Sequence, residues 1–271
     1  MSMQETQLEK GVINIVNDEE QIFNKDIKVT NRNGIPNTAE IPLDKPNHWL
    51  EIPNVICVYV DMINSTQLSA ETQNRSMAKV YRLFTNSIVR IFDYYESPYI
   101  DIKGDGVFAL FNASTPYKAL VAAVTVKTVV ENFIEKKIKS ITGEEHGAHI
   151  GIDQKTILVR KLGFRRFADR TDRQNEVWAG KVVNMAAKLA SLSKTHQLLV
   201  SDRYFKNIQN KLVLKSCGCG SESLQPVDLW KEIIVSDNDK FDFEKAYLLE
   251  SQWCSIHGLE FIKKVLKLDG E

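Results

Sequence analysis

The chain of 271 residues has no long hydrophobic run and no excess of charge of either sign. Its longest nearly apolar run, residues 119–126, is too short to cross a bilayer as a helix. Lys and Arg together number 35, as do Asp and Glu, so bulk charge does not favour nucleic-acid binding. A signal peptide is also missing, because the apolar stretch 11–16 is short and interrupted by Asn14. We therefore expect a cytoplasmic protein with no membrane or nucleic-acid partner.

Cysteine is scarce, with only four residues in the chain. Cys217 and Cys219 are separated by one glycine, and no histidine pair follows them at the spacing of a zinc finger. The favoured interpretation is reduced thiols in a cytoplasm, and a structural zinc site is the alternative.

Composition divides the chain into three parts. Residues 1–47 are rich in polar side chains and have little periodicity, so they predict an N-terminal extension, partly disordered or draped over the core. Residues 48–235 alternate strand and helix patterns and predict the main domain. Residues 236–271 predict a C-terminal helical appendage, with its helix over 241–268.

The main domain begins with a buried strand at 54–60, because this run is almost continuously apolar. Apolar residues then recur at spacings of three and four over 77–92, which predicts a helix. Further patterns predict, in order, a hairpin over 99–111, a helix over 113–139, a second hairpin over 146–152 and 156–161 and a basic loop at 165–173. They then predict a helix within 177–192 whose N-terminus lies near Gly180, a strand at 197–200, a short helix at 202–209 and a last strand at 228–235. The order predicts an α+β, ferredoxin-like split βαβ fold, with one antiparallel sheet and helices on one face.

Two carboxylates stand where such a fold would bring them together. Asp61 ends the buried first strand, and Asp105 lies in the turn of the following hairpin. Hard divalent cations such as Mg²⁺ prefer carboxylate and phosphate oxygens, so the pair predicts a metal site. The alternative is a capped turn at the end of a strand, and the glycines at 104 and 106 also suit an ordinary hairpin turn.

The turn after Asp61 runs from Met62 to Thr66 and leads into the first helix. Backbone N–H groups at the start of a helix bind phosphate. One short segment thus supplies both a metal ligand and a cradle for phosphate.

Three segments resemble the motifs of class III adenylate and guanylate cyclases. The first is Val60-Asp61-Met62-Ile63-Asn64-Ser65-Thr66, and the second is the Gly-Asp turn with its apolar strand, residues 102–111. The third is the stretch from Trp178 to Leu189. The resemblance covers residues 53–235, and the Gly-Gly-Asp/Glu-Glu-Phe signature of diguanylate cyclases is absent.

The resemblance implies a role for each matching residue. Asp61 and Asp105 would hold two divalent ions, Mn²⁺ or Mg²⁺, with the Met62 carbonyl. The amides of Ile63, Asn64, Ser65 and Thr66 would bind the triphosphate. Asn184 would position the ribose. Lys188 stands where the family has an arginine, so it either replaces that cation or is assisted by Lys181 or Arg173; the alternative is a surface lysine of a helix.

The resemblance also implies an assembly. In this family the metal ligands come from one subunit, and the asparagine and arginine come from the other. A chain with a single catalytic domain would therefore form a head-to-tail homodimer with two shared sites. The family's triphosphate lysine has no clear counterpart, and Lys231 is one candidate.

The base-reading positions differ from those of the purine cyclases. Asp101 replaces the usual lysine or glutamate, and Val177 replaces a polar partner. A carboxylate only accepts hydrogen bonds, so Asp101 suits guanine, cytosine N4 or uracil N3–H better than adenine. Tyr59 shares a strand face with Asp61 and would wall the base pocket. The alternative for Asp101 is pairing with Lys103 or a turn amide.

The segment 175–181 and the stand-alone build resemble the pyrimidine cyclases of Pycsar anti-phage systems. This resemblance implies that CTP or UTP, with cytosine slightly favoured, is converted to a cyclic messenger for a separate effector. The alternatives are a purine cyclase with unusual base readers and an inactive nucleotide sensor on the same fold. An RNA-binding domain is disfavoured by the neutral charge and the lack of an RNP-type sequence.

Overall fold

The structure is a computed structural model that describes residues 8–144, 146–163, 174–219, 225–236 and 239–270. It divides into two compact units. One unit joins Met1–Ile52 to Leu158–Ala179, and the other joins Pro53–Ile157 to Gly180–Glu271. The predicted boundaries at 47 and 235 divide the chain by composition, whereas these units divide it by spatial contact. The three-part division therefore stays a prediction.

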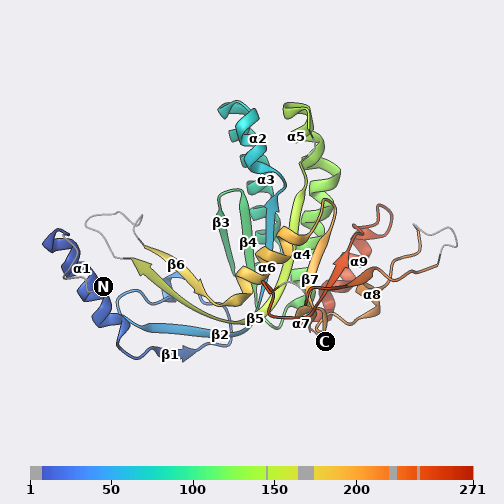
Figure 1. Cartoon of the computed structure of the whole chain (residues 1–271). Coiled ribbons are helices and arrows are strands. Elements are labelled where there is room, and N and C mark those ends of the chain that lie inside the picture. The colour runs from blue at the N-terminus through green and yellow to red at the C-terminus, as the bar shows by residue number, and fades with distance from the viewer. Residues whose placement is uncertain (1–7, 145, 164–173, 220–224, 237–238, 271) are drawn as a thin grey trace. The chain divides into compact units, whose positions relative to one another are not determined.

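The larger unit is built on a sheet (Figure 1). Its strand order is β3-β4-β2-β5-β7-β9-β8. The bounds are β2 His48–Met62, β3 Tyr99–Lys103, β4 Gly106–Phe111, β5 Ala148–Gly163, β7 Leu198–Ser201, β8 Trp230–Ile234 and β9 Lys245–Leu249. β4 lies antiparallel between β3 and β2, whereas β5 and β7 run parallel. The predicted hairpin over 99–111 is confirmed.

One face of this sheet carries the main core. Ile56, Val58 and Val60 of β2 point to it, together with a stripe of α3 (Asn74–Tyr94) at helical spacing. α4 (Pro116–Val129), the π-helical turn Val130–Ile134 and α5 (Glu135–Thr142) continue on the same face. Because side chains alternate along a strand, Cys57, Tyr59 and Asp61 point to the opposite face.

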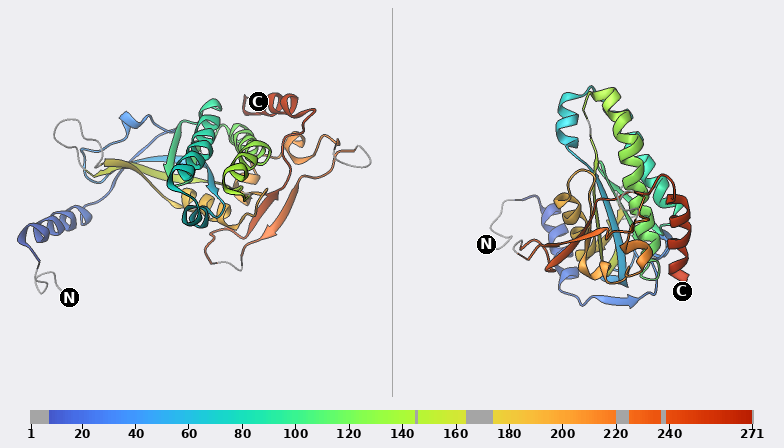
Figure 2. Two further views of the ribbon diagram at one scale, coloured as in Figure 1. Left: turned by 90° about the horizontal axis from the view of Figure 1, so that it is seen from above. Right: turned by 90° about the vertical axis from the view of Figure 1, so that its right-hand side faces the viewer.

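The opposite face is covered by α6 (Lys181–Leu192), as the two views of Figure 2 show. A Cβ atom on Gly151 of β5 would lie 2.1 Å from the Ala186 carbonyl oxygen, so the helix backbone rests directly on the strand. Leu189 of α6 packs with Leu199 of β7 in a second, smaller core. The expectation that helices lie on one face only is therefore wrong.

The smaller unit contains α1 (Lys10–Phe23), β1 (Lys28–Asn31) and β6 (Gln174–Ala179). β1 pairs in parallel with the start of β2, and β6 pairs antiparallel with the end of β5. The short 3₁₀-helix Thr38–Glu40 follows β1. Arg160 of β5 donates to the Leu43 carbonyl at 3.2 Å, and this bond holds the segment between the 3₁₀-helix and β2. Within the predicted N-terminal extension, residues 10–23 thus form a helix and residues 28–31 a strand.

Two predicted elements are wrong. The predicted hairpin over 146–152 and 156–161 is instead one continuous strand, β5 (Ala148–Gly163), because Asp153 is fully buried by a bidentate ion pair with Arg203. The region 241–268 is not one helix: β9 pairs with β7 and β8, and α9 (Gly258–Lys267) follows it. The sheet is accordingly not wholly antiparallel, and β8 is not the last strand. The basic loop 165–173 lies outside the described residues.

The remaining short helices are α2 (Ser65–Glu71), α7 (Asp202–Phe205), α8 (Lys211–Leu214) and the 3₁₀-helix Leu268–Gly270. Within the described ranges, each helix is too short or too polar to cross a membrane.

Candidate active site

Asp61 and Asp105 meet at one edge of the sheet. Asp61 is the penultimate residue of β2, and Asp105 lies in the turn that joins β3 to β4. A Cβ atom on Gly106 would lie 3.1 Å from Oδ1 of Asp61 and 2.7 Å from the Tyr59 hydroxyl. The Asp61 side chain therefore lies over the turn that carries Asp105, and glycine at 106 leaves room for it.

Both carboxylates are acceptors, and they face each other. Burial, followed by the negative charge of Asp105, raises the pKa of Asp61 to about 6. Oδ2 of Asp105 is buried and has no hydrogen-bond partner among the described residues. Two facing carboxylates with an unsatisfied oxygen are the donor set that a hard divalent cation fits.

The turn after β2 is held by the start of β5. The Ile63 amide donates to the Gly147 carbonyl at 3.1 Å, and the Ile63 carbonyl accepts from His146 Nδ1 at 3.1 Å. Asn64 adopts the left-handed conformation, with φ of 56°, and α2 begins at the next residue. The first helical hydrogen bond joins the Leu68 amide to the Asn64 carbonyl, so the amides of residues 64–66 precede it. The Ile63 amide is already engaged and fits its predicted phosphate contact poorly.

Asp101, Phe108 and Tyr59 form a row across three strands. Asp101 pairs with Phe108, and Phe108 pairs with Tyr59. The Tyr59 and Phe108 rings stack with 6.5 Å between centroids. Burial, together with the charges of Asp61 and Asp105, raises the pKa of Tyr59 to about 12, so the hydroxyl stays protonated. This row lies on the sheet face that also carries Asp61.

The carboxylate of Asp101 is held locally. Its Oδ1 accepts from the Ile102 amide at 2.8 Å, and its Oδ2 lies 2.7 Å from Nζ of Lys103. Pairing with Lys103 or a turn amide is the sequence-based alternative to base recognition by Asp101, and contacts with Lys103 and with a backbone amide are both present. A carboxylate has about four acceptor positions, so two contacts leave capacity for a ligand.

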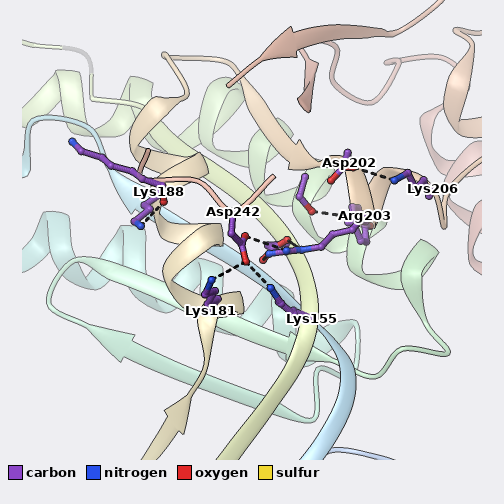
Figure 3. Close-up of polar contacts among 11 residues, drawn as sticks. Lys155, Lys181, Lys188, Asp202, Arg203, Lys206 and Asp242 are labelled. Carbon is purple, nitrogen blue, oxygen red and sulfur yellow. Dashed lines mark hydrogen bonds and ion pairs between the residues drawn. The ribbon is translucent and has the colours of Figure 1, made fainter. Parts of the chain in front are cut away.

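A groove runs along α6 and is closed by the segment between β8 and β9. Asn184 is exposed in it, and Nζ of Lys188 donates to the Lys240 carbonyl at 2.6 Å. Lys181 lies 3.5 Å from Asp242. Figure 3 shows Lys155, Lys181 and Arg203 arranged around Asp242.

The predicted site residues thus fall into separate groups. Neither Asp61 nor Asp105 is among the described residues that line the groove of Asn184 and Lys188. Val177 lies on β6 in the smaller unit, opposite Arg160. Lys231 is paired with Glu250 at 2.7 Å. Arg173 lies outside the described residues.

Sequence reasoning missed three residues of these groups as site candidates. Phe108 could have been found, because strand alternation places it opposite Asp101 and Tyr59. Lys240 and Asp242 carry no local signal, since they stand in a segment that was expected to begin a helix.

Comparisons with known proteins give relatives by sequence and by fold. No protein-family model matches the chain. A uridylate cyclase of Propioniciclava tarda is 31% identical over 247 residues, which cover 90% of this chain and 78% of that protein. A uridylate cyclase of Micromonospora echinofusca is 30% identical over 224 residues, covering 81% and 71%.

Solved structures share the fold at lower identity. The guanylate cyclase domain of RhGC from Catenaria anguillulae, in complex with GTP, superposes with a TM-score of 0.56 at 19% identity, covering 74% of this chain and 98% of that one. An adenylyl cyclase from P. aeruginosa gives a TM-score of 0.54 at 19% identity, covering 75% and 96%. The chain therefore shares the fold of class III cyclase domains.

Proposed function

The chain belongs to the nucleotidyl cyclase family that includes the uridylate cyclases, and we propose that it converts a pyrimidine nucleoside triphosphate to its 3′,5′-cyclic monophosphate and diphosphate. The observation that carries this proposal is the facing pair Asp61 and Asp105 on the sheet face opposite the main core. The family membership supports the reaction type, and the named relatives support a pyrimidine base.

The site is proposed to hold two divalent ions. Asp61 and Asp105 fit them, because each carboxylate lacks a cationic partner among the described residues and Oδ2 of Asp105 is buried without a hydrogen bond. The Met62 carbonyl is the third proposed ligand. Bound Mn²⁺ or Mg²⁺ supplies charge neutralisation at the triphosphate and activation of the 3′-hydroxyl.

The chain's own groups then position the substrate. The amides of Asn64, Ser65 and Thr66 face the triphosphate at the start of α2. In the reaction the 3′-oxygen forms a bond to the α-phosphorus and loses its proton, while the bond from the α-phosphorus to diphosphate breaks. Asn184 orients the ribose, and Lys188, with Lys181 nearby on the same helix, offsets the charge that builds up on the phosphate.

A homodimer is part of this proposal. Asn184 and Lys188 line a groove that contains neither metal-binding carboxylate, so a complete site needs a second source for one of the two groups. In a head-to-tail pair, each site would combine Asp61 and Asp105 of one subunit with Asn184 and Lys188 of the other.

The base is proposed to lie against the row of Asp101, Phe108 and Tyr59. An aromatic stack offers a flat wall, and Asp101 accepts from uracil N3–H or from the cytosine amine. The residues alone gave cytosine a slight preference. The relatives named uridylate cyclases shift the proposal towards uracil. Val177, at the family's second base-reading position, offers no polar group.

The product would act as a cytoplasmic second messenger on a separate effector during phage infection, as the resemblance to Pycsar cyclases implies. A purine cyclase and an inactive nucleotide sensor are the rival functions. The replacement of the family arginine by Lys188 favours the sensor, and the intact Asp61–Asp105 pair disfavours it.

The test is a competition among equal concentrations of ATP, GTP, CTP and UTP with Mn²⁺ or Mg²⁺, read out as cyclic products by mass spectrometry. We expect a cyclic pyrimidine nucleotide from the wild type and none from Asp61→Ala. Asp93→Ala, an exposed aspartate of α3, is the matched control and should retain activity. A cyclic purine as main product would overturn the base assignment, and binding without turnover under all conditions would favour the sensor.

A further inference from the structure

Three cysteines and one histidine gather in a cluster that does not include the carboxylate pair. Cys217, Cys219, Cys254 and His257 each offer one ligand atom, and these four atoms all lie within 4.8 Å of one another. Sγ of Cys219 lies 3.2 Å from Nδ1 of His257. The four side chains come from two segments, one before β8 and one between β9 and α9.

We propose that this cluster is a structural zinc site of the Cys₃His type. Tetrahedral Zn²⁺ binds cysteine sulfur at about 2.3 Å and histidine nitrogen at about 2.0–2.1 Å, which puts neighbouring ligand atoms roughly 3.5–3.8 Å apart. The observed spread fits four ligands around one centre. Thiolate and imidazole are soft and borderline ligands that select zinc over Mg²⁺ or Mn²⁺.

The segment of Cys254 and His257 has the local geometry of a metal-binding turn. The amides of Ile256 and His257 donate to the Cys254 sulfur, and the Gly258 amide donates to the Cys254 carbonyl at 2.8 Å. Such N–H donors stabilise a thiolate and orient it towards a metal. His257 stands immediately before α9, three residues after Cys254.

The segment of Cys217 and Cys219 is shaped for the same purpose. Gly218 adopts a φ of 86°, which glycine reaches without strain and which turns the chain between the two cysteines. Ser216 fixes the turn, because its hydroxyl accepts from the amides of Gly218 and Val227 at 3.2 and 3.0 Å. The two sulfurs are thereby directed at the second segment.

The position of the site explains what zinc would do. Trp253, next to Cys254, donates from Nε1 to Thr125 of α4 at 2.9 Å. Beyond α9, Asp269 accepts from the amides of Tyr117 and Lys118 at the start of α4. Zinc would thus join the loop before β8 to the C-terminal segment that packs on α4. With four protein ligands no position is left for substrate, so the site is structural.

A disulfide is the competing outcome for these residues, and the thiols here are free. A disulfide would use two of the three cysteines and leave His257 without a role. Zinc uses all four groups. Binding releases the thiol protons, so the affinity for zinc should rise with pH.

The experiment measures zinc in the full chain, purified without chelator, by plasma mass spectrometry. We expect about one zinc per chain in the wild type and at least a tenfold lower content in Cys254→Ser and in His257→Asn. Cys57→Ala and His196→Asn remove the same residue types elsewhere and should keep the full content. Asp61→Asn should keep it too, which separates this site from the proposed catalytic ions.

A folding failure of the variants is controlled by cobalt substitution of the wild type. After zinc removal, added Co²⁺ should give the visible absorption of a tetrahedral thiolate site. Added Zn²⁺ should displace it one to one. Four free thiols with no bound zinc and no cobalt spectrum would overturn the proposal, and so would a disulfide within the cluster in the protein as isolated.

Discussion

The rings of Tyr59 and Phe108 stack with an interplanar angle of 4° on the sheet face that carries Asp61, beside the carboxylate pair. Each ring is fixed by its strand, since the two residues are directly paired between β2 and β4. Burial of Tyr59 against Asp61 and Asp105 holds its hydroxyl protonated. A rigid pair of rings next to the proposed metal ligands suits the proposed binding of a flat base.

Loss of one ring of this pair should weaken binding of the nucleotide. An aromatic pair contributes about 0.5–1.5 kcal/mol beyond its area burial, so Phe108→Ala should raise KM about 3–10-fold with a smaller change in kcat. Tyr94→Ala, which removes a highly exposed ring, is the control. An unchanged KM in Phe108→Ala would place the base elsewhere.

Removal of one of the two facing carboxylates should raise the stability of the protein and lower its activity. Asp105→Asn abolishes the repulsion with Asp61, so in chelator at pH 7 the variant should melt about 2–4 °C higher than the wild type. The same variant should lose at least 10³-fold in turnover, because it lacks a metal ligand. A lower melting temperature with retained turnover would contradict the proposed role of Asp105.

The shared site can be tested by mixing two inactive variants. Lys188→Ala should lower kcat about 10²–10³-fold through the loss of one charge that faces the phosphate. Equal amounts of Asp61→Ala and Lys188→Ala, allowed to exchange subunits, should recover about a quarter of the wild-type activity, since half of the dimers are mixed and each holds one intact site. Recovery no greater than the average of the two separate variants would argue against a shared site.

Asp242 lies in the segment that closes the α6 groove, and its contribution to the free energy of unfolding should depend on pH. Burial alone would raise the pKa of Asp242, but Lys155, Arg203 and Lys181 outweigh it and hold the pKa below its usual value. A lowered carboxyl pKa contributes stability above the unfolded value near 3.9 that is lost as pH falls through the folded value. Asp242→Asn should therefore lose about 1–3 kcal/mol of unfolding free energy at pH 7.

The difference between Asp242→Asn and the wild type should shrink below about pH 4, as urea titrations from pH 3 to 7 would measure. Asp239→Asn, an exposed neighbour on the same groove, should show almost no difference at any pH. A difference that grows as pH falls would have the wrong sign for this ion-pair cluster.

Local patterns predicted the carboxylate pair because it depends on short-range structure. Asp61 follows a continuous apolar run and Asp105 follows a glycine turn, and both signals are visible within about ten residues. Strand alternation also placed Tyr59 beside Asp61 on one face. These inferences hold in the structure.

Long-range contacts account for what the sequence could not predict. Asp153 and Gln154 are typical of a turn, but the ion pair with Arg203, 50 residues later, keeps them inside a strand. Likewise Cys217 and Cys219 lacked a histidine at zinc-finger spacing, and the histidine that completes the cluster is residue 257. Neither partner is identifiable from the neighbouring residues alone.

The most direct test of the central claim is the fate of UTP when it is incubated with the wild-type chain and Mn²⁺, followed by phosphorus NMR and mass spectrometry. The account predicts 3′,5′-cyclic UMP and diphosphate in equal amounts. Release of UMP or UDP instead, or unchanged UTP while Mn²⁺–UTP binds tightly, would contradict it.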